Sequence, residues 1–201
     1  MDENLTAERT GLALMELVSS VPVTNEPVSS DPRTRSTMIV RKYCLETAAL
    51  DFTSALPPGP LSWLTLLPAL VGVWRLQAQM VSDIASCYGK SKILGSEQML
   101  YCLFRHATGH LLRDIVTRVG SRLIVKRVAL KGLQKLLRAL GIRVTQRVIG
   151  RGLARTIPIL GAVAIAAYAF YDTSNVGKTT IEFFSKEVEV SDEEIDEFEG
   201  A

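Results

Sequence analysis

The chain has 201 residues, of which 47% are hydrophobic and 6% aromatic, and it carries a formal net charge of +2. Its mean hydropathy of +0.19 is high for a water-soluble protein but too low for a protein with several membrane spans. The length suits one domain with tails. Three widely spaced cysteines, Cys44, Cys87 and Cys102, argue against a disulfide framework and favour a reducing, cytosolic setting.

The N-terminal region, residues 1–33, is expected to contain a short amphipathic helix over residues 4–20 and then a flexible linker. Prolines among Ser, Thr and Asn residues are typical of such linkers, and they stand here at Pro22, Pro27 and Pro32. The start of the chain is acidic, so it does not predict a secretory signal peptide.

Residues 34–187 are predicted to form one all-α domain, a helical bundle with two central apolar helices. Ala, Leu, Arg and Lys are frequent in it and favour helix. Pro57 to Pro60, Gly89 and Gly177 are expected to end helices. The expected helices cover residues 36–56, 61–88, 96–119, 121–140, 142–155, 157–171 and 179–187.

Two segments contain no charged residue: 52–74, with 23 positions, and 156–171, with 16. A membrane-spanning helix needs about 20 apolar residues. The proline cluster interrupts the first segment, and the second is short. Both segments therefore suit buried core helices, re-entrant hairpins or interfacial helices, and the sequence leaves these alternatives open.

Charge is distributed in two opposite blocks. Residues 113–155 hold twelve basic residues and one acid, a net +11, whereas residues 182–201 have a net −8. Residues 188–201 are expected to be a disordered acidic tail, and this tail is a candidate internal competitor for the basic block.

Many of the basic residues recur at four-residue spacing, which places them on one helix face opposite leucines and valines. Such a basic amphipathic helix suits an anionic membrane surface, although an ordinary solvated face is the alternative. Nucleic-acid binding is disfavoured because no aromatic residues are interleaved and no base-reading motif is present. The residues expected to bind the membrane or another anion are Arg118, Arg122, Lys126, Arg127, Lys131, Lys135, Arg143, Arg147, Arg151 and Arg155.

Two motifs resemble catalytic or binding sites but lack essential parts. The Gly-Lys-Thr at residues 177–179 follows an apolar helix, and Asp172 stands where a phosphate-binding loop has its first glycine. His106 and His110 have the spacing of two metal ligands on one helix face, but no glutamate lies between them, and Cys102 is too far from His110 for all three to share an ion. We therefore predict no catalytic residue, no metal site and no cofactor.

The stretches LQAQMVSDIASCYGK (76–90) and TIPILGAVAIAAYAFYDTSNVGKTTIEFF (156–184) resemble a bacterial all-α family. Members of that family often lie C-terminal to GTPase domains in membrane-associated GTPases, and the pattern is also similar to EcsC-like proteins. The resemblance covers about residues 40–185 and implies a membrane-associated helical module without an established catalytic residue. Because this chain has no GTPase domain, a GTPase would have to be a separate partner.

Together these patterns predict a non-catalytic, membrane-associated accessory or interaction protein on the cytoplasmic side of the membrane, peripheral or inserted. It would bind an anionic membrane surface through its basic region. The first alternative is a soluble helical protein–protein interaction module, in which both apolar segments form the protein's own core. A metal-dependent enzyme that uses His106 and His110 is a third interpretation.

Overall fold

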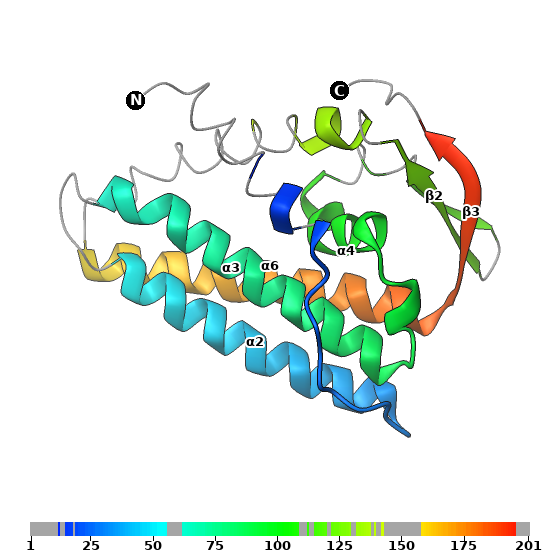
Figure 1. Cartoon of the computed structure of the whole chain (residues 1–201). Coiled ribbons are helices and arrows are strands. Elements are labelled where there is room, and N and C mark those ends of the chain that lie inside the picture. Colours follow the sequence, from blue (N-terminus) through cyan, green and yellow to red (C-terminus); the bar gives the residue numbers. More distant parts are fainter. Residues whose placement is uncertain are drawn as a thin grey trace.

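The architecture is shown by a computed structural model of the chain (Figure 1). The residues that it describes are 12, 15–17, 19–55, 62–108, 112, 115–119, 122–129, 132–137, 139, 142 and 158–195. The described residues are mostly helical with one small sheet, so the predicted helical bundle is confirmed as the fold class.

Three long helices form the body of the bundle: α2 (Pro32–Ala55), α3 (Ser62–Cys87) and α6 (Pro158–Ser185). A shorter helix, α4 (Ser96–Thr108), packs against α3 and α6 after a 3₁₀ turn, η1 (Ser91–Ile93). Figure 1 shows α2, α3 and α6 lying side by side, with the sheet at one end of the bundle. Within the described ranges, no helix combines the length and hydropathy that are needed to span a bilayer.

The ends of α2 and α3 follow from local chemistry. Asp31 accepts a hydrogen bond from the Thr34 amide at 3.2 Å, and Pro32 suits the first turn, so α2 begins four residues earlier than predicted. Gly89 has a φ of +65°. The amides of Lys90 and Gly89 donate to the carbonyls of Ala85 and Ser86, each at 2.8 Å, which confirms the prediction that Gly89 ends α3.

The predicted break at Gly177 is wrong, because α6 is continuous from Pro158 to Ser185. A Cβ atom at Gly177 would lie 2.5 Å from Val40 Cγ2 on α2. The glycine therefore permits a close approach of two packed helices and does not end one.

Residues 21–30 form an extended strap across α3, shown in blue in Figure 1, where the sequence predicts a flexible linker. Ser82 and Ser86 of α3 donate to the carbonyls of Pro22 and Glu26 at 2.6 and 2.5 Å. The Ser29 amide donates to the Cys87 carbonyl at 3.0 Å. The polar residues that suggested a linker thus lie beside hydrogen-bonding groups on α3, and these bonds hold the strap to the bundle.

The sheet has the order β1 (Val116–Val119), β2 (Arg122–Val128) and β3 (Glu187–Ile195). Strands β1 and β2 form an antiparallel hairpin, whereas β2 and β3 are parallel. The helices predicted over 96–119 and 121–140 are therefore wrong in the part that the sheet occupies. The prediction of disorder over 188–201 is likewise wrong for the residues in β3, since a basic strand and an acidic strand pair there.

The core lies between α3, α4, the C-terminal part of α6 and the inner face of the sheet. On β2, Leu123 and Val125 are buried, whereas Arg122 is exposed and Ile124 and Lys126 are half-buried, which is the alternation of a half-buried strand. The largest fully buried side chains include Met80, Ile84, Met99, Leu103, Phe183 and Phe184. This core fixes the C-terminal end of α6 against α4 and the sheet.

Candidate functional site

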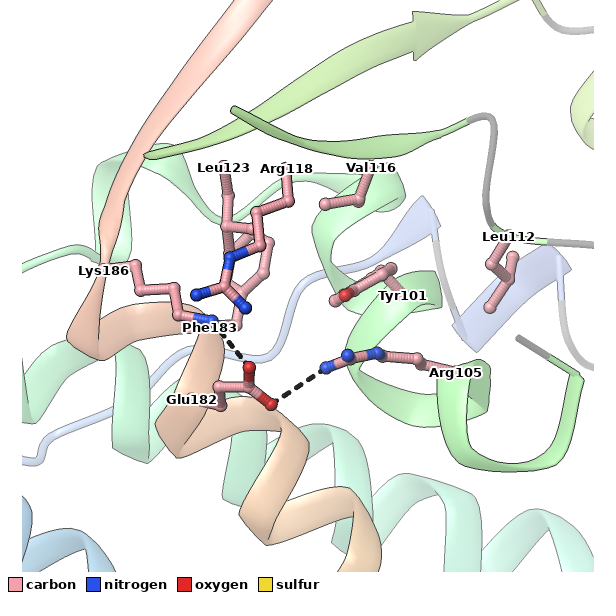
Figure 2. Close-up of a pocket in the computed structure, with 9 residues that line it drawn as sticks. All are labelled: Tyr101, Arg105, Leu112, Val116, Arg118, Leu123, Glu182, Phe183 and Lys186. Atoms are coloured by element: carbon pink, nitrogen blue, oxygen red, sulfur yellow. Dashed lines mark hydrogen bonds and ion pairs between the residues drawn. The ribbon is translucent and has the colours of Figure 1, made fainter. Parts of the chain in front are cut away.

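A cavity of about 270 Å³ opens where α4, the β1–β2 hairpin and the end of α6 meet (Figure 2). We call it the cationic pocket. It is lined by Tyr101, Arg105, Leu112, Val116, Arg118, Leu123, Glu182, Phe183 and Lys186.

Glu182 connects two of the basic residues that line this pocket. Its carboxylate accepts a hydrogen bond from Lys186 Nζ at 2.6 Å and another from Arg105 Nη1 at 3.1 Å. The hydrogen bond from Lys186 and, after it, the interaction with Arg105 hold the pKa of Glu182 below its usual value against the opposing effect of burial. Glu182 is therefore ionised at neutral pH and keeps both cations at the pocket.

The other polar groups of the pocket come from α4 and β1. The Arg105 guanidinium lies 5.3 Å from the centre of the Tyr101 ring, which also restricts its position. Val116 and Arg118 are two residues apart on β1 and share one face of the strand, so both reach the pocket. Figure 2 shows the Arg118 side chain pointing from its strand toward Glu182 and Lys186. Among the described residues that line the pocket, three are basic and one is acidic.

Lys90 fixes the backbone at the end of α6 next to this pocket. Its Nζ donates to the Phe184 carbonyl at 2.8 Å and also to the Lys186 carbonyl. These carbonyls lie at the C-terminus of the helix, where a cation is favourable. Burial lowers the pKa of Lys90. Lys90 thus sets the direction in which the chain leaves α6 and enters β3.

The structure places half of the ten predicted anion-binding residues. Arg118 lines the cationic pocket, and Lys135 is exposed. Arg122 forms ion pairs with Glu187 at 2.9 Å and with Glu189 at 3.9 Å. Lys126 and Arg127 lie on β2 opposite Ser191 and Glu194 of β3. The remaining five, Lys131, Arg143, Arg147, Arg151 and Arg155, lie outside the described residues.

The predicted single helical stripe is wrong for Arg118, Arg122, Lys126 and Arg127, because these residues belong to strands. On a strand, side-chain direction alternates with every residue, so spacing by four does not stack side chains as it does on a helix turn. In the structure, Arg118 lines the cationic pocket, and Arg122 forms ion pairs with acids of β3.

Arg105, Glu182 and Lys186 are pocket residues that the sequence analysis missed. Glu182 lies in the last turn of α6, and Lys186 directly follows the helix, four residues further on. This spacing suggests a helical ion pair, but nothing local connects the two residues with Arg105. Only the packing of α4 against α6 brings these side chains together.

His106, one of the two considered metal ligands, lies in a polar network beside the helices. Its Nε2 is 2.9 Å from Asp172 Oδ1, and Asp172 also accepts hydrogen bonds from Gln77 at 3.0 Å and Tyr168 at 3.2 Å. His110 lies outside the described residues. Among the residues with described side chains, no three His, Cys, Asp or Glu gather as metal ligands would.

The chain matches no known family model, no curated protein and no solved structure. Its resemblance to EcsC-like proteins and to helical modules behind GTPase domains accordingly stays a prediction. The geometry of the described residues is therefore the basis for inferring a function.

Proposed function

We propose that this protein is a non-catalytic accessory protein that binds peripherally to an anionic membrane surface. The observation that carries the proposal is an exposed apolar face on α6. Its three large side chains, Val163, Phe170 and Tyr171, are 53%, 41% and 63% exposed. Ala164 and Ala167 are exposed between them, and the spacing places all five on one side of the helix. We call these five residues the α6 apolar face.

The composition of this face suits the boundary between lipid and water. Aromatic side chains favour the headgroup level, and an interfacial helix combines them with basic residues at its edge. Lys178 is exposed seven residues after Tyr171 and so lies on the same side of α6. The opposite side of α6 packs on α2, α3 and α4, so the helix would lie along the surface of the membrane.

Membrane binding needs a contribution from charged residues in addition to the α6 apolar face. Fully burying one large apolar side chain contributes about 1.5–3 kcal/mol, and these three are about half exposed, so together they contribute about 2–4 kcal/mol. A basic residue near an anionic surface adds about 1 kcal/mol. The net +11 of residues 113–155 is the charge that we propose for this role. The apolar face alone is too weak to hold the protein at a membrane. Because the basic residues must supply the rest of the binding energy, we expect the protein to prefer anionic lipid.

Sedimentation with lipid vesicles tests the proposal. The triple variant Val163→Ser, Phe170→Ser, Tyr171→Ser is compared with the wild type on phosphatidylcholine vesicles with and without phosphatidylglycerol. A matched control, Met38→Ser with Leu45→Ser, removes two exposed apolar side chains from α2. We expect the wild type and the control to bind only the anionic vesicles and the triple variant to lose binding. A wild type that does not sediment with anionic vesicles, or a triple variant that binds like the control, contradicts the proposal.

A second candidate function is a helical protein–protein interaction module that makes no lipid contact. The ion pairs of Arg122 with Glu187 and Glu189 favour it, because they compensate a basic side chain within the protein. Under this alternative the α6 apolar face would contact a partner protein, for which a separate GTPase is the suggestion from the family resemblance. The same vesicle experiment separates the two functions.

A further inference from the structure

Strand β3 lies at one edge of the sheet, so one of its two sides faces away from β2 (Figure 1). Among the described residues, β2 is the only strand that pairs with it. We propose that the outer edge of β3 binds an extended, basic segment of a partner protein, which joins the sheet as a further strand. This edge is separate from the α6 apolar face, so the proposal does not depend on membrane binding.

The backbone of β3 is suited to strand addition. Successive N–H and C=O groups of a strand point to opposite sides, so pairing with β2 uses only those on the inner side. Strand β3 has nine residues, whereas β1 at the opposite edge has four. Many proteins recognise an extended peptide by adding it to such an edge, with main-chain hydrogen bonds as the source of affinity. The longer edge of this sheet is therefore the better template.

The side chains of β3 determine which charge a partner strand should carry. Five of its nine residues are acidic, and none is basic. The side chains of Glu187 and Glu189 are 74% and 64% exposed, so a strand on the outer side can also reach them. Opposite charges on neighbouring strands stabilise a sheet, whereas like charges repel. The edge therefore disfavours β3 of a second copy and favours a basic segment.

The inner side of β3 already shows the pairing that we infer for the outer side. Arg122 of β2 lies opposite Glu187, and its guanidinium is 2.9 Å from the Glu187 carboxylate and 3.9 Å from that of Glu189. On the other face of the strand, Val190 is 41% exposed, so a further apolar neighbour can cover it. The segment that fits the outer edge thus alternates basic and apolar residues, as Arg122-Leu123 does in β2.

A synthetic peptide with the sequence of residues 122–128 is the probe, because this sequence pairs with β3 within the chain. Fluorescence anisotropy of the labelled peptide, titrated with the full chain, measures its affinity. A second peptide carries glutamate in place of every basic residue. A third keeps the basic residues but has methylated backbone nitrogens, so it cannot donate main-chain hydrogen bonds. We expect only the first peptide to bind, and to bind more weakly at higher salt.

The double variant Glu187→Gln with Glu189→Gln removes two acids from the edge and leaves the backbone intact. We expect it to bind the basic peptide about tenfold more weakly, because two cross-strand charge pairs are lost. Both side chains are mostly exposed, so the variant should fold, and a thermal melt checks this. Glu46→Gln with Asp31→Asn is the matched control, since it removes the same charge on and beside α2. The control should bind like the wild type.

Binding of the basic peptide that the β3 double variant weakens and the control does not supports the proposal. Absence of binding overturns it and leaves protection against self-association as the role of the acidic edge. Equal binding of the methylated peptide would show attraction by charge without strand addition, and equal losses in the two double variants would show that β3 is not the site, so either result also overturns it. The triple variant of the α6 apolar face should still bind the peptide, so failure of the membrane proposal and failure of this one give different results.

Discussion

Gly177 of α6 lies so close to Val40 of α2 that a Cβ atom at residue 177 would be 2.5 and 2.6 Å from the two Val40 methyl carbons. We therefore expect Gly177→Ala to lower the free energy of unfolding by about 1–3 kcal/mol, the usual cost of overpacking. This cost opposes the gain of up to about 1 kcal/mol that alanine brings to a helix interior. Urea unfolding followed by circular dichroism measures the change.

A double variant tests the cause. Val40→Ala removes both clashing methyl groups, so Gly177→Ala should cost much less in that background than in the wild type. Gly72→Ala is the control, because its nearest neighbour is the flexible tip of Leu50 at 3.0 Å, and it should be close to neutral. Equal costs of Gly177→Ala in both backgrounds would show that the contact with Val40 is not the reason.

The outcome at Gly177 shows what local patterns can and cannot predict. The end of α3 at Gly89 was predictable, because a glycine after an apolar helix is a local signal. Gly177 has the same local signal, but its role depends on Val40, which is far away in the sequence. Likewise, the cationic pocket forms only where α4, β1 and α6 meet, so the residue spacing within any one of these elements does not predict it.

The sheet was missed for a different reason. Basic residues at four-residue spacing suggested a helix through 116–128, but the same stretch is rich in the β-branched residues valine, isoleucine and threonine, and Gly120-Ser121 separates two such runs as a hairpin turn would. This β-branched enrichment was a usable signal. The parallel pairing of β2 with the acidic β3 was not, since it depends on a strand beyond α6.

Asp172 should make stability sensitive to acid. Burial raises its pKa, but hydrogen bonds from His106, Gln77 and Tyr168 outweigh burial, and the pKa in the folded protein is lowered. The ionised form therefore stabilises the fold at a pH above the unfolded value of about 3.9, and this contribution is lost as the pH falls through the lower, folded value. We expect Asp172→Asn to reduce the acid-dependent loss of stability below about pH 4.

Urea unfolding at neutral pH and at successively lower pH measures this effect for the wild type and the variant. Glu46→Gln, on α2, is a control carboxylate, because its ion pair is with Lys42, is exposed and is 3.9 Å long. If the wild type and Asp172→Asn lose stability in parallel as the pH falls, the carboxylate is not responsible.

All three cysteines should be unreactive in the folded protein. Burial is the main cause that raises the pKa of each thiol, to about 11 for Cys87 and about 12 for Cys102. Because the thiolate is the reactive form, a disulfide reagent such as DTNB should label the native protein slowly at mildly alkaline pH. Denaturation in guanidinium should make all three react at once. Rapid labelling of any cysteine under native conditions would show that its surroundings open readily.

Asp83 should be important for the strap over α3. It accepts hydrogen bonds from Thr24 at 2.6 Å, Tyr43 at 2.8 Å and Gln79 at 3.0 Å. Asp83→Ala leaves these donors without their acceptor, and we expect it to lower the free energy of unfolding by about 1–3 kcal/mol. Glu46→Ala is the control, because its ion pair with Lys42 is exposed and 3.9 Å long.

Hydrogen exchange reports where the structure opens. The Ser29 amide, which bonds the Cys87 carbonyl, should exchange faster in Asp83→Ala than in the control. Unchanged protection at Ser29 together with lower global stability would place the effect of Asp83 within α2 and α3, through Tyr43, and not in the strap.

The acids of β3 should oppose binding of the protein to anionic membranes. Glu187 and Glu189 pair with Arg122, and all three side chains are mostly exposed, so each pair contributes only about 0–1 kcal/mol to stability. Replacing both acids by glutamine keeps the strand but removes two negative charges beside the basic strand. We therefore expect nearly unchanged stability and about fivefold tighter binding to phosphatidylglycerol vesicles at low salt, since one uncovered basic residue is worth about 1 kcal/mol at such a surface.

Vesicle sedimentation at low and moderate salt measures this change. The gain should shrink at moderate salt, because exposed charges are screened there. Glu46→Gln with Asp31→Asn on and beside α2 removes the same charge at a distance from the sheet, and it controls for the effect of net charge alone. Equal gains in the two double variants would mean that only net charge matters, and no gain in either would mean that β3 does not compete with lipid for the basic strand. A gain confined to Glu187→Gln with Glu189→Gln would identify β3 as an internal competitor, since the acids would then act through Arg122 and its neighbours on β2.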